Sequence, residues 1–203
     1  MKYYKDGEIE VKTPGKIILF GEHAVVYGYP AIAGAINLFS FCKIQKTKNR
    51  GIQFDLPDFN LSYNEKSVIE LSNLKDKFPQ FYYGINEIAK KHNLDLNYHK
   101  ITLYSEIWPG SGLGSSASIS TALIIGLNKY FRLKLRKTQI LDYTYSMEKF
   151  VHGQPSGIDN TICIKGGLGY FKNKKFKYKK KYKKKSFNNT EINVYRKLRK
   201  HKK

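Results

Sequence analysis

The chain has 203 residues and 41% hydrophobic content, which suffices for one buried core and predicts one domain, or one domain with a fragment. Its longest apolar run, residues 122–127, is far shorter than the roughly 20 residues that cross a bilayer, and residues 1–10 lack the apolar core of a signal peptide. We therefore expect a soluble cytoplasmic protein without a membrane partner, in which the isolated Cys42 and Cys163 are free thiols.

The net charge of +21 suggests nucleic-acid binding, but the distribution of the charge favours another interpretation. Residues 172–203 hold 16 Lys and Arg against one acid and account for +15, which leaves +6 for the rest of the chain. We interpret this segment as a disordered, lysine-rich, low-complexity tail that follows a domain at residues 1–171, and expect no specific nucleic-acid partner. The alternative is a basic tail whose interleaved aromatic residues bind nucleic acid or an anionic surface.

Strands are expected at three places in the chain. Apolar residues between 11 and 20 indicate strands broken by a turn at Pro14-Gly15, and residues 31–44 are rich in strand-forming residues. Residues 101–107 alternate between apolar and polar along a strand that leads into a glycine-rich loop.

Three helices are expected beside these strands. One begins near Pro79 and presents a stripe of four apolar residues, Phe81, Ile85, Ile88 and Ala89. The second is the apolar stretch 118–131, and the third starts with Thr138 as its N-cap and ends before Gly153. The mixture predicts the α+β class, with the start of a hairpin at residues 166–171.

The glycine-rich loop before the second helix is predicted to bind phosphate. It consists of Pro109, Gly110, Ser111, Gly112, Leu113, Gly114, Ser115, Ser116 and Ala117. Glycines at alternate positions let the backbone approach an anion, and the helix adds unpaired N–H groups and its positive dipole end. Two hydroxyls, of Ser115 and Ser116, suit a phosphate and a magnesium ion. The spacing matches neither the Walker A nor the Rossmann pattern, and a flexible turn before a core helix is the alternative interpretation.

The loop resembles the second motif of the GHMP kinases. Residues 14–28, which include Glu22 and His23, and residues 148–160 are similar to two further motifs of the mevalonate kinase branch. A galactokinase would carry an acid and a tyrosine soon after this glutamate and histidine, and a homoserine kinase would lack them. The resemblance spans about residues 11–171 and implies a GHMP kinase N-terminal lobe, which is ribosomal protein S5 domain 2-like. Nothing after residue 171 resembles the second lobe, so we expect the C-terminal lobe to be missing.

The resemblance implies transfer of the ATP γ-phosphate to the primary hydroxyl of mevalonate, in isoprenoid biosynthesis. It implies that residues 109–117 bind ATP, that Ser116 and Glu148 bind Mg2+, and that Glu22 and His23 bind the substrate. Asp159, for which a helix cap is the alternative, is the implied catalytic base. The turn at residues 155–157 places Asp159 near a helix N-terminus, which favours the ionised carboxylate and lowers its basicity. The implied partner of this aspartate is Lys16, which would polarise the hydroxyl.

Several alternatives stay open at this point. The chain could be another GHMP kinase, such as a phosphomevalonate kinase, or a non-catalytic fragment with a basic tail. The oligomeric state is also open, and a homodimer is one alternative. Without a second lobe, the chain is expected to phosphorylate mevalonate barely, if at all. We interpret Tyr98, Tyr104 and Trp108 as core or sheet aromatics, with the nucleotide base pocket as the alternative for Trp108. His152 either touches the substrate or braces its turn.

Overall fold

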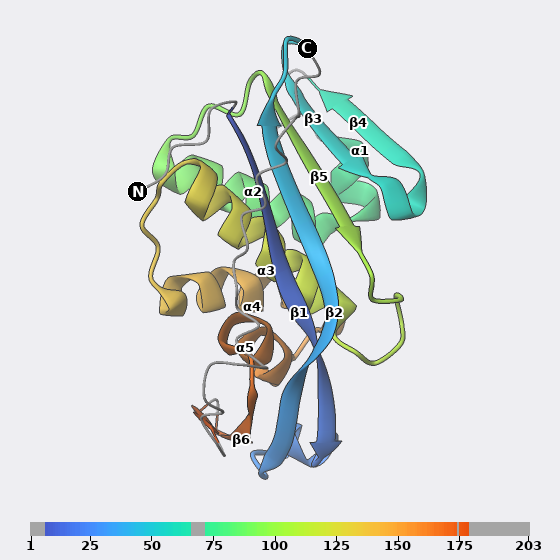
Figure 1. Cartoon of the computed structure of the whole chain (residues 1–203), viewed down its shortest axis with the longest axis vertical. Helices are drawn as coiled ribbons and strands as arrows, with labels where there is room; N and C mark the ends of the chain where they lie inside the picture. Colours follow the sequence, from blue (N-terminus) through green and yellow to red (C-terminus); the bar gives the residue numbers. More distant parts are fainter. Residues whose placement is uncertain (1–6, 66–71, 174, 179–203) are drawn as a thin grey trace, which may run out of the picture.

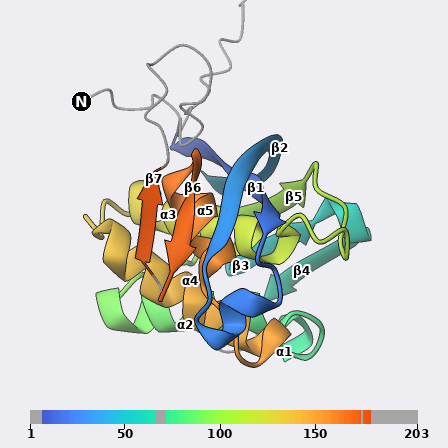
Figure 2. The ribbon, with the colours of Figure 1, turned by 90° about the horizontal axis from the view of Figure 1, so that it is seen from below.

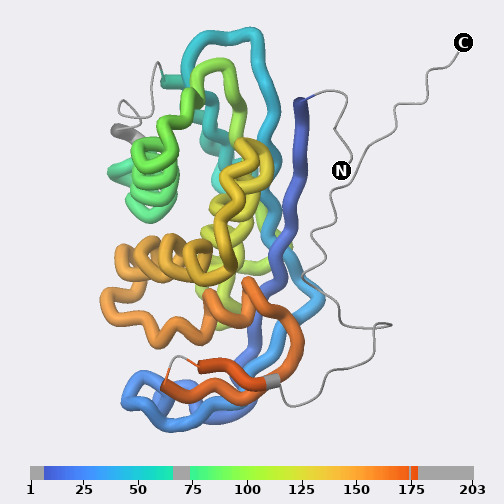
Figure 3. Tube along the Cα trace, turned by 90° about the vertical axis from the view of Figure 1, so that its left-hand side faces the viewer, coloured from blue at the N-terminus to red at the C-terminus, as the bar shows by residue number. Residues whose placement is uncertain are grey.

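The computed structural model describes residues 7–65, 72–173 and 175–178, which form one seven-stranded sheet with helices against one face (Figures 1 and 3). The sheet order is β4-β3-β5-β2-β6-β7, and β1 pairs with β2 off this path. β3 and β5 run parallel, and the other pairs are antiparallel. The strands are β1 Glu8–Phe20, β2 Ala31–Lys46, β3 Ile52–Leu56, β4 Leu61–Glu65, β5 His99–Ser105, β6 Leu168–Lys172 and β7 Lys175–Tyr178.

The helices lie between these strands in the chain. The α-helices are α1 Ser72–Lys77, α2 Pro79–His92, α3 Ser115–Tyr130, α4 Lys137–His152 and α5 Ile158–Lys165, and the short 3-10 helices are η1 Ala24–Tyr27 and η2 Pro57–Phe59. α3 is the central helix, because every residue from Ala117 to Leu127 is buried between the sheet and the other helices (Figure 2). None of the helices described is long and apolar enough to cross a membrane.

The long strand β2 joins the two ends of the sheet. β1 lies along nearly its whole length, while β5 pairs with residues 40–46 and β6 pairs with residues 31–34. The apolar face of β2 encloses the larger core together with α3 and α2. The predicted stripe of α2, Phe81, Ile85, Ile88 and Ala89, is buried as expected. The sequence predictions of the α+β class, of β2, of β5 and of α2 are therefore confirmed.

The turn predicted at Pro14-Gly15 is wrong, because β1 continues through it with a bulge between Pro14 and Lys16. A Cβ atom on Gly15 would lie 2.9 Å from the carbonyl oxygen of Leu113 and 2.8 Å from the Ile107 side chain, so this position has room only for glycine. At the bulge the Lys16 backbone N–H donates a 2.8 Å hydrogen bond to the Leu113 carbonyl oxygen. The bulge thus joins β1 to the glycine-rich loop.

The predicted start of α4 is also wrong. The helix begins at Lys137, one residue before Thr138, and its N-cap is Arg136. The Arg136 backbone N–H donates to the Gln139 side-chain oxygen at 3.0 Å, so a side chain within the first turn replaces the expected threonine cap. The helix ends before Gly153 as predicted.

Two of the three aromatic residues assigned to the core or the sheet lie at the surface. Trp108 is 81% exposed and Tyr98 is 47% exposed, because both lie in connecting segments beside β5 and not in the strand. Only Tyr104 is a sheet residue, with its ring stacked on Phe41 at a centroid distance of 4.7 Å. Cys42 and Cys163 are buried free thiols, as predicted.

The hairpin predicted at residues 166–171 is β6 with β7, which pair from Gly169–Tyr178 to Lys172–Lys175. The predicted tail boundary at residue 171 therefore falls inside a hairpin, and the disorder expected from residue 172 onward is wrong for β7. The reason is that Phe176 packs against the smaller core cluster, so that this residue of the lysine-rich run contributes apolar area. Residues 179–203 of the predicted tail lie outside the described residues.

Candidate active site

The predicted phosphate loop lies between β5 and α3, and its backbone is open to solvent at two of its three glycines. Gly110, Gly112 and Gly114 have φ angles of 75°, 74° and 74°, which other residues adopt only with strain. A Cβ atom on Gly110 or Gly112 would meet no atom within 4 Å. The N-terminus of α3 at Ser115 adjoins this open space, and its backbone N–H groups and positive dipole end suit a phosphate group there.

The other members of the loop hold its shape. Ser111 Oγ donates to the Trp108 carbonyl oxygen at 2.7 Å, and Ser115 Oγ donates to the Ile107 carbonyl oxygen at 3.2 Å. Pro109 is exposed, whereas Ala117 is buried against the core. The loop is therefore a fixed turn tied to α3, and its role in binding ATP stays a prediction.

Lys16 extends from the bulge of β1, past the loop, to Asp159. Its Nζ lies 3.3 Å from Asp159 Oδ1, and the two side chains are 6% and 26% exposed. A Cβ atom on Gly114 would lie 2.7 Å from Lys16 Cγ, so glycine at this position leaves the lysine its path. Asp159 lies in the first turn of α5, two residues after the N-cap Gly157. The structure thus brings together the two residues that were predicted to be catalytic.

The pKa of Asp159 differs from the expectation. Burial raises the pKa of this carboxyl, and the neighbouring Lys16 opposes the rise only in part, while the charge of Glu22 adds to it. The predicted loss of basicity at a helix N-terminus is therefore wrong, because desolvation by burial is the largest effect on this carboxyl. Asp159 binds a proton more readily than an exposed aspartate does.

Glu148 is a buried carboxylate on α4, with 1% of the residue exposed. Ser116 Oγ donates to its Oε1 at 2.7 Å, and His152 Nε2 lies 3.6 Å from its Oε2, one helical turn along α4. Burial raises the pKa of Glu148, and the Ser116 hydrogen bond and His152 oppose this rise. The two predicted magnesium ligands are therefore hydrogen-bonded to each other, and His152 lies next to Glu148.

The donor set fits a magnesium ion. Glu148 and Ser116 offer a carboxylate and a hydroxyl oxygen, which are the hard ligands that this cation takes. Burial is the largest cause of the raised pKa of Glu148 and of Asp159, and a bound cation would oppose it, as Lys16 does in part. Within residues 7–65, 72–173 and 175–178, no group of three or more His, Cys, Asp or Glu side chains could hold a metal ion. Magnesium needs no such group, because it usually keeps several waters and takes one or two protein carboxylates.

Glu22 and His23, the predicted substrate-binding pair, lie in the exposed turn between β1 and η1. His23 is the N-cap of η1. The charge of Glu22 raises the pKa of Asp159, which places the glutamate within electrostatic reach of that carboxyl. Their contact with a substrate stays a prediction.

The chain is similar in sequence to proteins of a known kinase family. Residues 80–167 match the family model of the GHMP kinases N terminal domain. The chain is 37% identical to the mevalonate kinase of Methanocaldococcus jannaschii over 174 residues, which is 82% of this chain and 55% of that protein. It is 32% identical to the mevalonate kinase of Pyrococcus furiosus over 182 residues, 84% of this chain and 54% of that protein. The chain belongs to the GHMP kinases.

Solved structures of GHMP kinases share the fold. The crystal structure of the Methanococcus jannaschii mevalonate kinase matches with a TM-score of 0.75 and 34% identity, over 84% of this chain and 55% of that one. The L. major mevalonate kinase in complex with R-mevalonate matches with a TM-score of 0.65 and 27% identity, over 88% of this chain and 55% of that one. The chain spans about half the length of the curated relatives that it matches.

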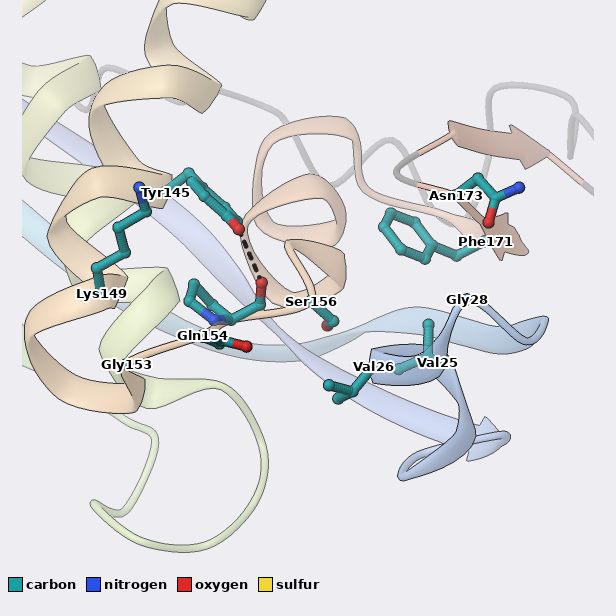
Figure 4. Close-up of a pocket in the computed structure, with 11 residues that line it drawn as sticks. Val25, Val26, Gly28, Tyr145, Lys149, Gly153, Gln154, Ser156, Phe171 and Asn173 are labelled. Atoms are coloured by element: carbon teal, nitrogen blue, oxygen red, sulfur yellow. Dashed lines mark hydrogen bonds between the residues drawn. The ribbon is translucent and has the colours of Figure 1, made fainter.

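A pocket of about 360 Å³ lies at the turn between α4 and α5 in this GHMP kinase chain (Figure 4). The turn that ends at the N-cap of α5 forms one wall with Gln154 and Ser156, and η1 forms another with Val25 and Val26. Ser156 Oγ accepts a 3.3 Å hydrogen bond from the backbone N–H of the first residue of α5, which ties this wall to the helix that carries Asp159. Phe171 of β6 adds an apolar wall. The pocket therefore combines apolar side chains of η1 and β6 with polar groups of the turn that leads into α5.

Sequence reasoning missed most of this lining. Tyr145 OH donates to the Pro155 carbonyl oxygen at 3.0 Å and thereby fixes the turn between α4 and α5. The two glycines that flank the turn, Gly153 and Gly157, both have positive φ angles and were the available signal. The pocket itself could not be inferred, because its walls come from residues 25–28, 145–156 and 171–173, which are distant from one another in the sequence.

Proposed function

We propose that this chain is the nucleotide-binding part of a mevalonate kinase, a cytoplasmic enzyme that uses ATP and Mg2+ to phosphorylate the primary hydroxyl of mevalonate. The observation that carries the proposal is the Lys16–Asp159 pair, 3.3 Å apart and joined to the glycine-rich loop through the Lys16 backbone. Phosphoryl transfer to an alcohol needs a group that prepares the hydroxyl next to the site that holds the phosphates. A homodimer is compatible with the proposal.

Asp159 would act as the general base. Its raised pKa lets the carboxylate accept the hydroxyl proton more readily than an exposed aspartate would. Lys16 Nζ, held beside the same carboxylate, would donate to the attacking oxygen and stabilise its developing negative charge. The two residues would therefore have different roles: the aspartate would accept the proton, and the lysine would stabilise the negative charge on the attacking oxygen.

The loop and α3 would hold the phosphates of ATP. Backbone at Gly110 and Gly112 faces open space, and the first turn of α3 adds N–H groups and a positive dipole end. Ser116 and Glu148 would hold the magnesium ion, which supplies positive charge to the phosphates when it is bound. Glu148 is kept in position by the hydrogen bond from Ser116, and His152 lies near its other carboxylate oxygen.

The pocket at the turn before α5 would hold the alcohol. Val25, Val26 and Phe171 suit the carbon skeleton of a small hydroxy acid, and Gln154 and Ser156 suit its polar groups. The acceptor is proposed to be mevalonate because the relatives that match over more than four fifths of this chain are mevalonate kinases.

The test is an assay of phosphoryl transfer to mevalonate, phosphomevalonate, galactose and homoserine. Because the chain spans about half of its relatives, the assay uses the chain and a chimaera in which residues 1–171 replace the matching part of the M. jannaschii mevalonate kinase. We expect the chimaera to phosphorylate mevalonate, and Asp159→Asn to lower kcat at least about 100-fold with little change in Mg-ATP affinity. The exposed acid Asp142 on α4 provides the control, Asp142→Asn, which should leave kcat unchanged. Parental turnover in Asp159→Asn, or preference for another alcohol, would overturn the proposal.

A further inference from the structure

Trp108 is a large apolar side chain in an unusual place. It is the single tryptophan of the chain, and 81% of it is exposed. Tryptophan is highly buried on average, so an exposed indole on a loop is informative where an exposed leucine would not be. It directly precedes Pro109, the first residue of the phosphate loop.

The backbone around Trp108 is fixed although the ring is exposed. Ile107 on one side is 1% exposed and anchors the chain in the core, and Pro109 on the other side restricts the Trp108 backbone to extended conformations. The Trp108 carbonyl oxygen accepts two hydrogen bonds from Ser111, from its Oγ at 2.7 Å and from its backbone N–H at 3.3 Å. The ring is therefore presented from a rigid turn, so that ordering it against a ligand costs little backbone entropy.

The same turn is tied to the proposed phosphate site. Ser115 Oγ at the start of α3 donates to the carbonyl oxygen of Ile107, the residue directly before Trp108, at 3.2 Å. A nucleotide whose phosphates lie at the N-terminus of α3 would extend its base beyond the loop. Stacking on an aromatic face suits a purine base, and a base–aromatic stack is tolerant of orientation.

We propose that Trp108 is a nucleotide-binding residue that stacks on the purine base of ATP. The inference rests on the proposed function, since it takes the phosphates to lie at the glycine-rich loop. It assigns base recognition to the side chain at the entrance of the loop and phosphate recognition to the loop backbone. Nucleoside triphosphates should therefore bind more tightly than inorganic triphosphate, which has no base.

Fluorescence of the full chain tests the stack, because all tryptophan emission comes from Trp108. With excitation at 295 nm, ATP with Mg2+ should quench or shift the emission saturably. Inorganic triphosphate should compete with ATP and reverse this change while producing little change of its own. A shift that follows protein concentration and not nucleotide would assign the ring to a contact between copies of the chain and overturn the proposal.

Calorimetry on variants separates stacking from general burial. Trp108→Leu keeps an apolar side chain without a π face and should weaken ATP binding about 5- to 100-fold, the range found when a stacking aromatic is removed. Trp108→Phe keeps a π face and should bind within about 3-fold of the parent. Neither change should alter the affinity for inorganic triphosphate, whereas Gly114→Val should abolish it.

The outcomes distinguish this inference from the proposed function. If Trp108→Leu binds ATP like the parent while Gly114→Val does not bind it, the phosphate loop stands and the stacking proposal is wrong. If neither ATP nor inorganic triphosphate binds the parent chain, both proposals are wrong. Equal losses in Trp108→Leu and Trp108→Phe would also contradict stacking, since only one of them lacks an aromatic ring.

Discussion

The replacement Gly114→Ala tests whether the glycine-rich loop holds Lys16 in place. At the Gly114 φ angle of 74°, a residue with a Cβ atom is destabilised by roughly 1–2 kcal/mol, because the left-handed backbone conformation strains it. The new Cβ would also lie 2.7 Å from Lys16 Cγ. Lys16 is 5% exposed and its Cγ is close to the backbone, so the side chain cannot swing clear, and overpacking of this kind costs about 1–3 kcal/mol more. The matched control is Gly112→Ala, which has the same φ angle of 74° but whose Cβ would meet no atom within 4 Å.

Thermal unfolding of the two variants measures the difference. For a chain of this length each kcal/mol lowers Tm by roughly 2–4 °C, so Gly114→Ala should unfold roughly 2–12 °C below Gly112→Ala. The pKa of Asp159 should also rise in Gly114→Ala alone, because displacement of Lys16 removes the charge that opposes the effect of burial. Carbon-13 NMR of the Asp159 carboxyl group follows this titration. Equal Tm values together with an unchanged Asp159 titration would refute the reasoning.

Three further predictions concern the side chains around this pair. Ser116→Ala removes the hydroxyl that donates to Glu148, so the pKa of Glu148 should rise further, and an NMR titration that stays at the parental midpoint would contradict this. Because burial raises the folded-state pKa of Glu148, its ionisation costs stability as pH rises through that pKa, so Glu148→Gln should raise Tm at neutral pH and lose this gain below about pH 4. A gain of equal size at both pH values would argue against a charge effect. Ser118→Ala removes a buried hydroxyl that donates to the Thr13 carbonyl oxygen at 2.9 Å and lies 3.2 Å from Thr13 Oγ1, and should cost about 1–3 kcal/mol in urea unfolding. Loss of the exposed Ser62 hydroxyl in Ser62→Ala should cost much less.

Local patterns were sufficient for the elements that surround the site. The apolar stripe of α2 follows helical periodicity, which involves only residues three or four positions apart. α3 could be recognised as a continuous run of small and apolar residues, which is typical of a helix buried on all sides. The positive φ angles of the glycine-rich loop follow from the absence of a Cβ atom. The motifs therefore located Lys16, Ser116 and Asp159 before any contact between them was known.

The same local reasoning failed wherever a distant segment decided the outcome. Pro14-Gly15 carries the signal of a turn, yet the strand continues because the bulge is hydrogen-bonded to Leu113. Thr13 and Ser118, 105 residues apart, exchange hydrogen bonds beside that bulge and fix β1 on α3. No pattern within a short window contains such a pairing.

Sequence by itself determined the family, the main helices and strands, and the residue types available for phosphoryl transfer. Tertiary structure alone decided the pKa values and the solvent exposure of these residues. Glu148 and Asp159 have raised pKa values because segments from elsewhere in the chain exclude water from their carboxylates, and Trp108 is exposed because its turn leaves the core. Burial and desolvation are sums over neighbours in space, and neighbours in space are set by the fold and not by position along the chain.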